Sequence, residues 1–373
     1  MQLETIKTPS LIVDAERMKR NAAQMTARAK QLNVKLRPHV KTHRCAEIAR
    51  LQTQGNAGGI MVSTLAEAHF FAQDGFSDIT YGVPIEAGKF AEAIALSKNI
   101  ARFSVLTDDA ETVEKLNEAA RKENATLDVF LKVDIGYHRC GVEPDTREAF
   151  EIPQKIAESR NLNFAGILTH AGHSYHADTP EKLLAVAREE RDKMKNFADE
   201  LRAKGLTVQD VSIGSTPTVS AVDHLEGVTE LRAGNYIFFD AFQATLGSCS
   251  FEDCALTVLA AVVHRDEKRR KIVVDAGAIA LSKDRGAVEF DSTCGYGRVY
   301  DLAGSDLNLR VETLSQEHGE ISVSDEAVFN SLKVGSRVRI LANHSCLTAL
   351  QHSHYHILEA GKIVDRWEIN RGW

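Results

Sequence analysis

The sequence predicts an α/β protein in which a (β/α)8 barrel is followed by a C-terminal antiparallel β domain. The 373 residues are 43% hydrophobic and 26% charged, an ordinary globular composition, and this length suits two domains or one large barrel plus an addition. From residue 8 to about 240, short β-branched runs alternate with longer polar-periodic segments, the pattern of β-α units around a parallel sheet. After residue 250 the runs are short and alternating, which is typical of antiparallel strands. We therefore predict a barrel over residues 8–245 and a β domain over residues 250–373, which residues 1–10 could join.

The first part supplies the strands and helices of the predicted barrel. The predicted strands are Leu11–Asp14, Val34–His39, Gly59–Ser63, Asp78–Gly82, Arg102–Leu106, Asp128–Asp134, Asn163–His170, Val208–Ile213 and Leu231–Phe238. Between them we expect helices such as Ala15–Leu32, Leu65–Asp74, Asp109–Glu123 and Pro180–Lys204. About eight such units in some 230 residues match a (β/α)8 barrel, whose catalytic groups lie where strands run into the following loops.

The second part supplies the predicted β domain, in which Gly, Asp and Asn separate the strands. The predicted strands are Leu256–Asp266, Lys271–Ala276, Leu307–Leu314, Glu320–Val323, Ser336–Leu341 and His354–Ile369. The sequence contains no Pro/Ser-rich linker, no low-complexity run and no repeat beyond the β-α alternation.

The charge balance argues against nucleic acids and membranes as partners. Forty-five Lys and Arg against 52 Asp and Glu give a formal charge of -7, so no bulk attraction draws the chain to polyanions. No stretch reaches the ~18 uninterrupted apolar residues of a membrane helix, and charged residues stand where a signal peptide needs an apolar run. The six cysteines form no CxxC pair and are expected to be reduced thiols. We expect a cytoplasmic protein that acts on small molecules.

The segment KLRPHVKTHR, residues 35–44, places a lysine after an early barrel strand. Lys41, at the C-terminal end of such a strand, would face the catalytic mouth. Burial and neighbouring cations there can lower the pKa of a lysine enough to make its amine a nucleophile toward a carbonyl group. Lys41 is therefore a candidate catalytic residue. The alternative is a solvated basic turn that pairs with helix carboxylates.

Two further strand ends carry candidate acid, base and anion-binding groups. In KVDIGYHRCG, residues 132–141, a glycine turn presents Arg139, which can donate to a phenolate or carboxylate with fixed geometry. In GILTHAGHSY, residues 166–175, a strand ends in His170 and a turn of small residues carries His173 and Tyr175. Two histidines and a tyrosine at a barrel mouth are candidates for acid/base work or ligand binding. The alternatives are a surface arginine and hydrogen-bonded structural histidines.

Two late loops have the composition of a phosphate site. IGSTPT, residues 213–218, and LRAGNYIFFD, residues 231–240, place small residues after late barrel strands. Small residues let backbone N–H groups close around a phosphate, and phosphate sites in this fold lie after the seventh and eighth strands. We therefore expect a phosphate group at these two loops, although Gly-Ser-Thr turns are common elsewhere.

The segment NHSC, residues 343–346, is a candidate metal site. On an extended chain the side chains of His344 and Cys346 leave the same face and can bind one cation. A thiolate with an imidazole favours zinc over magnesium or manganese, and two protein ligands leave positions for water and substrate oxygens, as at a catalytic ion. The alternative is a buried cysteine beside a capping histidine. Three histidines that alternate along the next strand are expected to be structural or solvent-facing: His352, His354 and His356.

Taken together, these segments resemble the fold-type III pyridoxal-phosphate enzymes, the alanine-racemase-like group, and more closely its D-serine dehydratase and D-threonine aldolase branch. The resemblance covers nearly the whole chain, and any one motif alone is weak. The motifs, in order, are TPSLIVD, RPHVKTH, VDIGYHRCGV, THAGHSY, GSTPT, LRAGNY, VDAGAIALSKDRG, EHG, NHSC and the terminal RGW.

The resemblance implies roles for individual residues. Lys41 looks like the lysine that holds pyridoxal 5'-phosphate, and Arg139 looks like the arginine beside the phenolic oxygen of that cofactor. Four residues fall on motifs that surround the cofactor and its phosphate in this branch: Tyr175, Thr216, Gly234 and Asn235. His344 and Cys346 match the metal pair of the dehydratase type, whereas the aldolase type is similar to HxD at this place. The cysteine therefore favours a dehydratase and zinc.

The family implies a lyase that acts on a small D-amino acid. Lys41 is expected to remove the Cα proton, and a zinc ion at the β-hydroxyl is expected to make water a better leaving group, so that D-serine yields pyruvate and ammonia. The main alternative is retro-aldol cleavage to glycine and an aldehyde, for which His170 or His173 could be the base. Remoter alternatives are an amino-acid racemase, a non-catalytic pyridoxal-phosphate carrier and a barrel enzyme for a sugar phosphate. Related enzymes are homodimers with shared sites, so we expect a homodimer.

Overall fold

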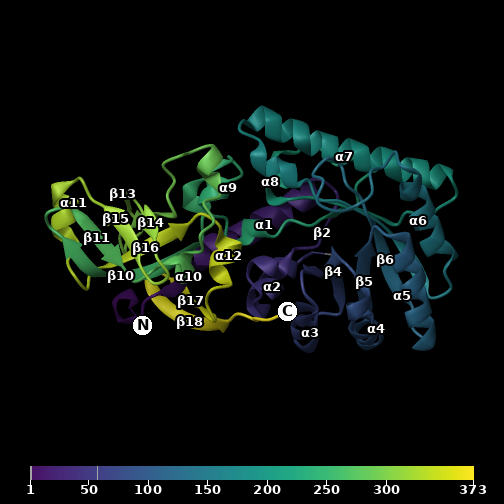
Figure 1. Cartoon of the computed structure of the whole chain (residues 1–373), viewed down its shortest axis with the longest axis horizontal. Coiled ribbons are helices and arrows are strands. Elements are labelled where there is room, and N and C mark those ends of the chain that lie inside the picture. Colours follow the sequence, from purple (N-terminus) through teal and green to yellow (C-terminus); the bar gives the residue numbers. More distant parts are fainter. Residues whose placement is uncertain (1, 57) are drawn as a thin grey trace. The chain divides into compact units, whose positions relative to one another are not determined.

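The computed structural model describes residues 2–56 and 58–373, and the chain divides into two compact units (Figure 1). The barrel unit comprises Gln24–Gly234 and Asn370–Trp373, and the β unit comprises Met1–Ala23 and Asn235–Ile369. These bounds differ from the predicted domains, because residues 8–23 and 235–245 belong to the β unit. The predicted division at residues 245 and 250 stays a prediction.

The barrel unit is built on a parallel sheet. Its eight strands among the described residues are β2 (Lys35–Leu36), β3 (Ile60–Val62), β4 (Asp78–Pro84), β5 (Arg102–Thr107), β6 (Leu127–Lys132), β7 (Leu162–Leu168), β8 (Asp210–Ile213) and β9 (Glu230–Leu231). They follow the order β2-β9-β8-β7-β6-β5-β4-β3. A parallel bridge between His39 and Met61 joins the two ends of that order, so the sheet closes into a barrel.

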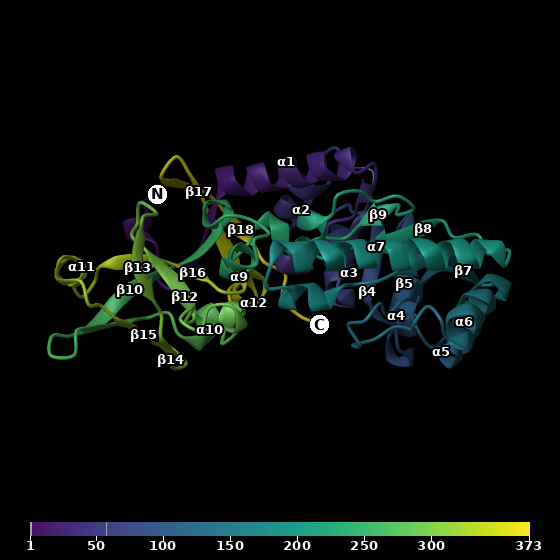
Figure 2. The same ribbon diagram turned by 90° about the horizontal axis from the view of Figure 1, so that it is seen from above.

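Helices alternate with these strands along the chain. They are α2 (Ala46–Thr53), α3 (Leu65–Gln73), α4 (Phe90–Asn99), α5 (Ala110–Lys122), α6 (Arg147–Glu158), α7 (Pro180–Ala203) and α8 (Thr216–Ala221), and α1 (Ala15–Gln31) begins in the β unit and ends in the barrel unit. Capping residues mark several starts, because the side chains of Thr64, Asp109 and Thr179 accept hydrogen bonds from first-turn N–H groups. Helices α7 and α8 lie side by side (Figure 1), and Figure 2 shows α7 from above.

The barrel interior has an apolar core, and a buried ion cluster stands among its strands. Met61, Phe130 and Leu168 belong to the packed core. Arg37, which is 1% exposed, donates to Glu230 at 2.7 Å and to Asp78 at 2.7 Å. This arginine of the RPHVKTH segment therefore links three strand regions and has a structural role.

The β unit carries the remaining strands. They are β1 (Ser10–Asp14), β10 (Leu256–Asp266), β11 (Lys271–Val274), β12 (Gly297–Tyr300), β13 (Asp306–Arg310), β14 (Thr313–Leu314), β15 (Gly319–Ser322), β16 (Arg337–Ala342), β17 (His354–Glu359) and β18 (Lys362–Glu368). Its helices are α9 (Ala241–Thr245), α10 (Ala278–Leu281), α11 (Glu326–Ser331) and α12 (Ser345–Ala349). The main path of the sheet runs β13-β12-β16-β10-β1-β17-β18.

The predicted fold class is confirmed, with corrections in the assignment of strands. Strand β1 was expected to belong to the barrel, but it pairs antiparallel with β10 and parallel with β17, so it lies in the sheet of the β unit and makes that sheet mixed. The run predicted as one strand over His354–Ile369 is a hairpin, because Ala360 and Gly361 both have positive φ, as a two-residue hairpin turn requires. Strand β12 was not predicted.

Strand β1 is held in place by an apolar cluster on one face of this sheet. Ile12 of β1 packs with Leu3, Ile6, Leu259 and Leu358, all buried. The cluster joins the start of the chain to strands that lie hundreds of residues later. Among the described residues, no helix has both the length and the apolar character that a membrane crossing needs.

Candidate active site

Lys41 lies on a short 3-10 turn, Val40–Thr42, directly after the barrel-closing segment at His39. Its side chain is exposed, while His39 is half-buried. Burial, and then the positive charges of Lys41 and Arg232, hold the pKa of His39 well below its usual range. The lysine therefore stands beside a neutral imidazole at the mouth of the barrel.

Three further cations accompany Lys41 within the barrel unit: Lys132, Arg139 and Arg232. Lys132, at the end of β6, is 5% exposed, and burial together with the charges of Arg232 and Arg139 lowers its pKa to about 8. Arg232 follows β9 and is 6% exposed; burial lowers its pKa to about 10. Its guanidinium donates to Ser212 Oγ at 2.8 Å and to the carbonyl of Thr169.

The histidines of the GILTHAGHSY segment follow strand β7. His170 comes two residues after the end of β7, and burial, followed by the charges of Lys41, Lys132 and Arg139, holds its pKa well below the usual range. His170 is thus a neutral group that faces the same cations as His39. His173 and Tyr175 lie on the next turn, Gly172–His176, and both are half-buried.

The loop that follows β6 carries Arg139 and Tyr137, and the Tyr137 ring lies between Arg139 and His170. The carboxylate of Asp134 accepts from the backbone N–H groups of Gly136 and Tyr137 at 2.9 Å each, which fixes the turn. The guanidinium of Arg139 lies 5.1 Å from the centre of the Tyr137 ring, and this ring meets His170 edge-on at 6.0 Å. Arg139 is exposed, and its position depends on the tyrosine under it.

The two predicted phosphate loops contain an unpartnered buried hydroxyl and two positions that favour glycine. Ser215 and Thr218 form a capping box at the start of α8, and the hydroxyl Oγ1 of the intervening Thr216 is buried with no hydrogen-bond partner among the described residues. Gly214 has φ +116°, which favours glycine. At Gly234 a Cβ atom would lie 2.5 Å from the carbonyl oxygen of His39, so only glycine fits there.

This set of residues fits pyridoxal phosphate. Three buried polar atoms of this set have no hydrogen-bond partner among the described residues: Nδ1 of His39, Nδ1 of His173 and Oγ1 of Thr216. Within the described part of the chain, neither Lys132 nor Arg232 makes an ion pair. An uncompensated group of buried cations is unfavourable until an anion binds, and a phosphate with a phenolate supplies negative charge of the right kind.

The predicted metal pair lies in the β unit, after strand β16. His344 is the residue before α12, and Cys346 lies on its first turn; both side chains are half-buried. The Nδ1 atom of His344 lies 2.6 Å from Oδ2 of Asp284. A carboxylate on one imidazole nitrogen orients the other nitrogen toward a metal and increases its basicity, an arrangement common around protein-bound zinc. Burial lowers the pKa of His344, but Asp284 and Cys346 together raise it by more, so the pKa of this imidazole lies well above its usual range.

Asn235 belongs to the same cluster of the β unit. Its amide Nδ2 donates to Oδ2 of Asp240 at 2.7 Å and lies 3.6 Å from Sγ of Cys346, and its Oδ1 is buried with no partner among the described residues. Asp240 also accepts from the backbone N–H of Ser345 at 2.9 Å. An imidazole and a thiol fit a divalent cation of the zinc type, but no group of three or more metal-ligating side chains is present in the described part of the chain. The predicted role of Asn235 at the cofactor stays a prediction.

Several residues of these two groups were not singled out from the sequence. Lys132 and Arg232 are buried charges. A charged residue is normally predicted to be exposed to solvent, unless the alternation of inward and outward side chains along a strand places it inside. Arg232 stands two residues before Gly234 in LRAGNY, so strand alternation was a usable signal. Asp284 is 60 residues from His344 along the chain, and no local spacing connects them.

Comparison with known families matches both parts of the chain. Residues 13–241 match the alanine racemase N-terminal domain, and residues 255–358 match a serine dehydratase domain. The first match alone covers more than half of the chain.

Full-length relatives agree with these matches. The chain is 38% identical to D-threo-3-hydroxyaspartate dehydratase of Delftia sp. strain HT23, over 100% of this chain and 99% of the relative, and 35% identical to D-serine dehydratase of Dictyostelium discoideum, over 100% and 98%. It is 29% identical to D-threonine aldolase of Arthrobacter sp., over 99% and 93%. A solved structure of the Delftia dehydratase superposes with a TM-score of 0.96 at 37% identity and covers 100% of both chains, and another solved structure of such a dehydratase is of a metal-free mutant form.

The predicted family and the predicted class of enzyme, a pyridoxal-phosphate-dependent lyase, are confirmed by these relatives. The chain therefore belongs to the alanine-racemase-like family of pyridoxal-phosphate enzymes, in the branch that contains the D-serine dehydratases, the D-threo-3-hydroxyaspartate dehydratase and the D-threonine aldolases.

Proposed function

We propose that this protein eliminates water from a small D-3-hydroxy amino acid and releases a 2-oxo acid and ammonia. The observation that carries the proposal is the histidine and cysteine pair, His344 and Cys346, with Asp284 behind the histidine, in a chain that is similar to two dehydratases over its full length. The substrates that those relatives are named for, D-threo-3-hydroxyaspartate and D-serine, share a β-hydroxyl group. They define the substrate class proposed here.

The barrel unit would hold pyridoxal phosphate. Lys41 is proposed to attach it covalently, Arg139 to donate to its phenolic oxygen, and Thr216 with Gly234 to receive its phosphate. Tyr175 and Asn235 complete the proposed set of cofactor-binding residues. The bound cofactor supplies a conjugated ring that accepts the electrons of a broken Cα bond.

Lys41 is the proposed base for the Cα proton. Its charge lies close to His39 and His170, whose pKa values it helps to lower. The pKa values of His39 and His170 are lowered, so neither histidine adds positive charge to the site at neutral pH. Lys132 and Arg232 keep the negative charge of a bound carboxylate or phosphate compensated.

A metal held by His344 and Cys346 is proposed to act on the leaving hydroxyl, and a divalent cation there supplies the Lewis acid that makes water a better leaving group. The thiol of Cys346 favours zinc over harder cations. The protein's own contribution is the orientation of the imidazole by Asp284 at 2.6 Å.

Retro-aldol cleavage is the second candidate, since D-threonine aldolase is also a relative. Cleavage needs a base on the β-hydroxyl rather than a better leaving group, and His170 or His173 would serve in that role. The buried Nδ1 of His173 has no partner among the described residues, which leaves that nitrogen able to accept a proton. The higher similarity to dehydratases, together with Cys346, favours elimination.

A substrate panel tests the proposal. The holoenzyme is incubated with the D- and L-isomers of serine, threonine and 3-hydroxyaspartate, with and without a metal chelator, and the products are identified. Elimination from D-isomers only, abolished by the chelator, supports the proposal, because one base and one metal in fixed positions align a single enantiomer. Turnover of L-serine at an equal rate contradicts it. The expected homodimer and the expected cytoplasmic location stay predictions.

A further inference from the structure

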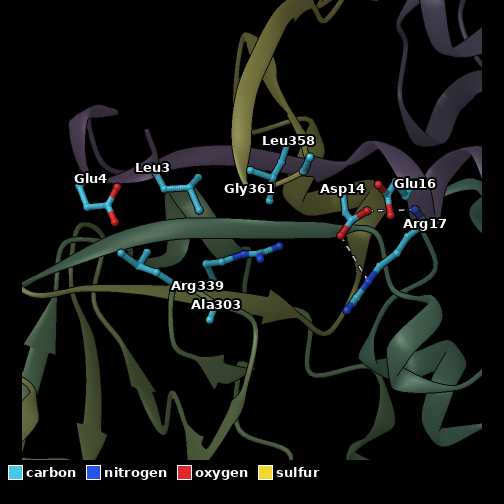
Figure 3. Close-up of a pocket in the computed structure, with 11 residues that line it drawn as sticks. Leu3, Glu4, Asp14, Glu16, Arg17, Ala303, Arg339, Leu358 and Gly361 are labelled. Carbon is cyan, nitrogen blue, oxygen red and sulfur yellow. Dashed lines mark hydrogen bonds and ion pairs between the residues drawn. The ribbon is translucent and has the colours of Figure 1, made fainter. Parts of the chain in front are cut away.

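The β unit holds a cavity of about 510 Å³ beside the end of strand β1 (Figure 3). Arg339 of β16 is the buried charge in its lining, and Asp14 and Arg17 line it at the junction of β1 and α1. Leu3 and Leu358 add an apolar wall. All these residues belong to the β unit, so the cavity is complete within one compact part of the chain.

Arg339 has an unusual set of contacts for a buried arginine. It is 7% exposed, and its Nε donates to Oγ1 of Thr257 at 3.1 Å. No carboxylate of the described residues lies within ion-pair distance of its guanidinium. Asp14 and Asp301 raise its pKa through space, yet burial outweighs them, so that its pKa is lowered. Among the described residues, this guanidinium thus has no direct ion pair at the cavity.

The other buried arginines of this protein differ from Arg339 in whether they pair with a carboxylate. Five arginines are buried among the described residues: Arg37, Arg44, Arg191, Arg232 and Arg339. The first three each have a carboxylate partner at 2.7 to 2.9 Å. Of the two without an ion pair, Arg232 lies in the candidate cofactor site, where an anion is expected. Arg339 is the other buried arginine without an ion pair among the described residues.

We propose that the cavity at Arg339 is a binding site for a small carboxylate, separate from the catalytic residues. A guanidinium presents parallel N–H groups that match the two oxygens of a carboxylate. Arg17 provides a second positive charge, but two of its nitrogens already have partners. Its Nε pairs with Asp14 at 3.4 Å, and its Nη1 donates to the carbonyl of Cys254 at 3.1 Å. The anionic group of the ligand therefore belongs at Arg339.

The charges of the other lining residues bear on which carboxylate-containing ligands fit the cavity. Glu4 and Glu16 are exposed residues of the same cavity, and with Asp14 they outnumber the two arginines. A polyanion would be repelled by these carboxylates, whereas the ammonium group of an amino acid would pair with them. The lining therefore favours a small amino acid over a simple carboxylate.

Calorimetric titration of the holoenzyme tests the site, with acetate and L-alanine as probes and chloride at matched ionic strength as the reference. The wild type should show saturable binding of L-alanine, with acetate weaker. Arg339→Gln should weaken both by about 10-fold or more, the loss expected when a charge-assisted pair is removed. The control Arg366→Gln removes an exposed positive charge from the same unit and should leave binding unchanged.

Three further measurements keep the test decisive. The visible absorbance of the cofactor is followed in parallel, since L-alanine at the cofactor would change the spectrum and binding at Arg339 would not. Should Arg339→Gln fold poorly, Thr257→Val removes the hydroxyl that holds the guanidinium and should also weaken binding. Glu16→Gln should reduce the preference for L-alanine over acetate. Equal binding to the wild type and Arg339→Gln, or no saturable binding to the wild type, overturns the proposal.

Discussion

The backbone of Gly172 lies against the ring of Tyr137: a Cβ atom at position 172 would be only 2.3 Å from Cε1 of that ring. The same ring lies under Arg139 and edge-on to His170. Two loops that follow neighbouring barrel strands, β6 and β7, thus interlock through one aromatic side chain. The glycine of THAGHSY is explained by this contact rather than by backbone conformation, since its φ is not positive.

Gly172→Ala should therefore displace Tyr137 and, with it, Arg139. We expect kcat to fall about 10- to 100-fold while circular dichroism stays native, since small displacements of positioning groups have effects of that size. Tyr137→Phe retains the ring and should keep near-normal activity. Full activity of Gly172→Ala would show that the position of Tyr137 does not matter to the reaction.

Lys41→Ala should abolish both the visible absorbance of the bound cofactor and turnover, because the covalent attachment and the base are assigned to this one amine. The attachment is checked directly by borohydride reduction of the wild type followed by peptide mapping. Peptides that contain Lys132 are the matched control for the mapping, because this second lysine of the site is buried and has a lowered pKa. A reduced adduct on Lys132 or Lys283 would overturn the assignment.

Asp284→Asn should weaken metal binding by about 10- to 100-fold, the usual cost of losing the carboxylate behind a ligating histidine. Metal affinity is measured by competition with a coloured chelator, so the readout does not depend on activity. Asp291→Asn, which changes a half-buried hydrogen-bonding carboxylate of the same unit, is the control. Unchanged affinity in Asp284→Asn would mean that the contact does not serve the metal.

His43 is expected to make the stability of the protein depend on pH. It is fully buried, its Nδ1 accepts from the N–H of Cys45, its Nε2 bonds Gln52 at 2.8 Å, and burial lowers its pKa to about 4. Because the folded-state pKa lies below that of the unfolded chain, the contribution of His43, roughly 3 kcal/mol, is present above about pH 6.5 and lost as the pH falls toward 4.

Denaturant unfolding at several pH values checks this expectation. His43→Asn keeps an acceptor for the N–H of Cys45 and cannot be protonated, so its free energy of unfolding should change less between pH 6.5 and 4 than that of the wild type. His318→Asn replaces an exposed histidine and should leave the wild-type dependence intact. Identical pH dependence of the wild type and His43→Asn would contradict the assigned role.

The sequence was sufficient for the barrel because each β-α unit is local. It was not sufficient for β1, whose partners β10 and β17 lie more than 200 residues away and whose local pattern is that of any strand. Strand β12 was missed because Gly297–Tyr300 is short and begins with glycine.

At the site, residues that stand alone after a strand, such as Lys41 and His170, could be found from position. Lys132 and Arg232 were missed: strand alternation was a usable signal for Arg232, but the burial of both residues among other cations is shown only by the folded barrel. The partner of His344, Asp284, likewise required the tertiary structure.

The central claim, elimination rather than cleavage, is tested most directly by the products formed from D-threo-3-hydroxyaspartate. Loss of water followed by hydrolysis gives oxaloacetate and ammonia in equal amounts, whereas retro-aldol cleavage gives glycine and glyoxylate. The assignment predicts oxaloacetate and ammonia from the wild type, with a loss of that activity in Cys346→Asp. Glycine and glyoxylate as the main products of the wild type would contradict the account and identify the protein as an aldolase.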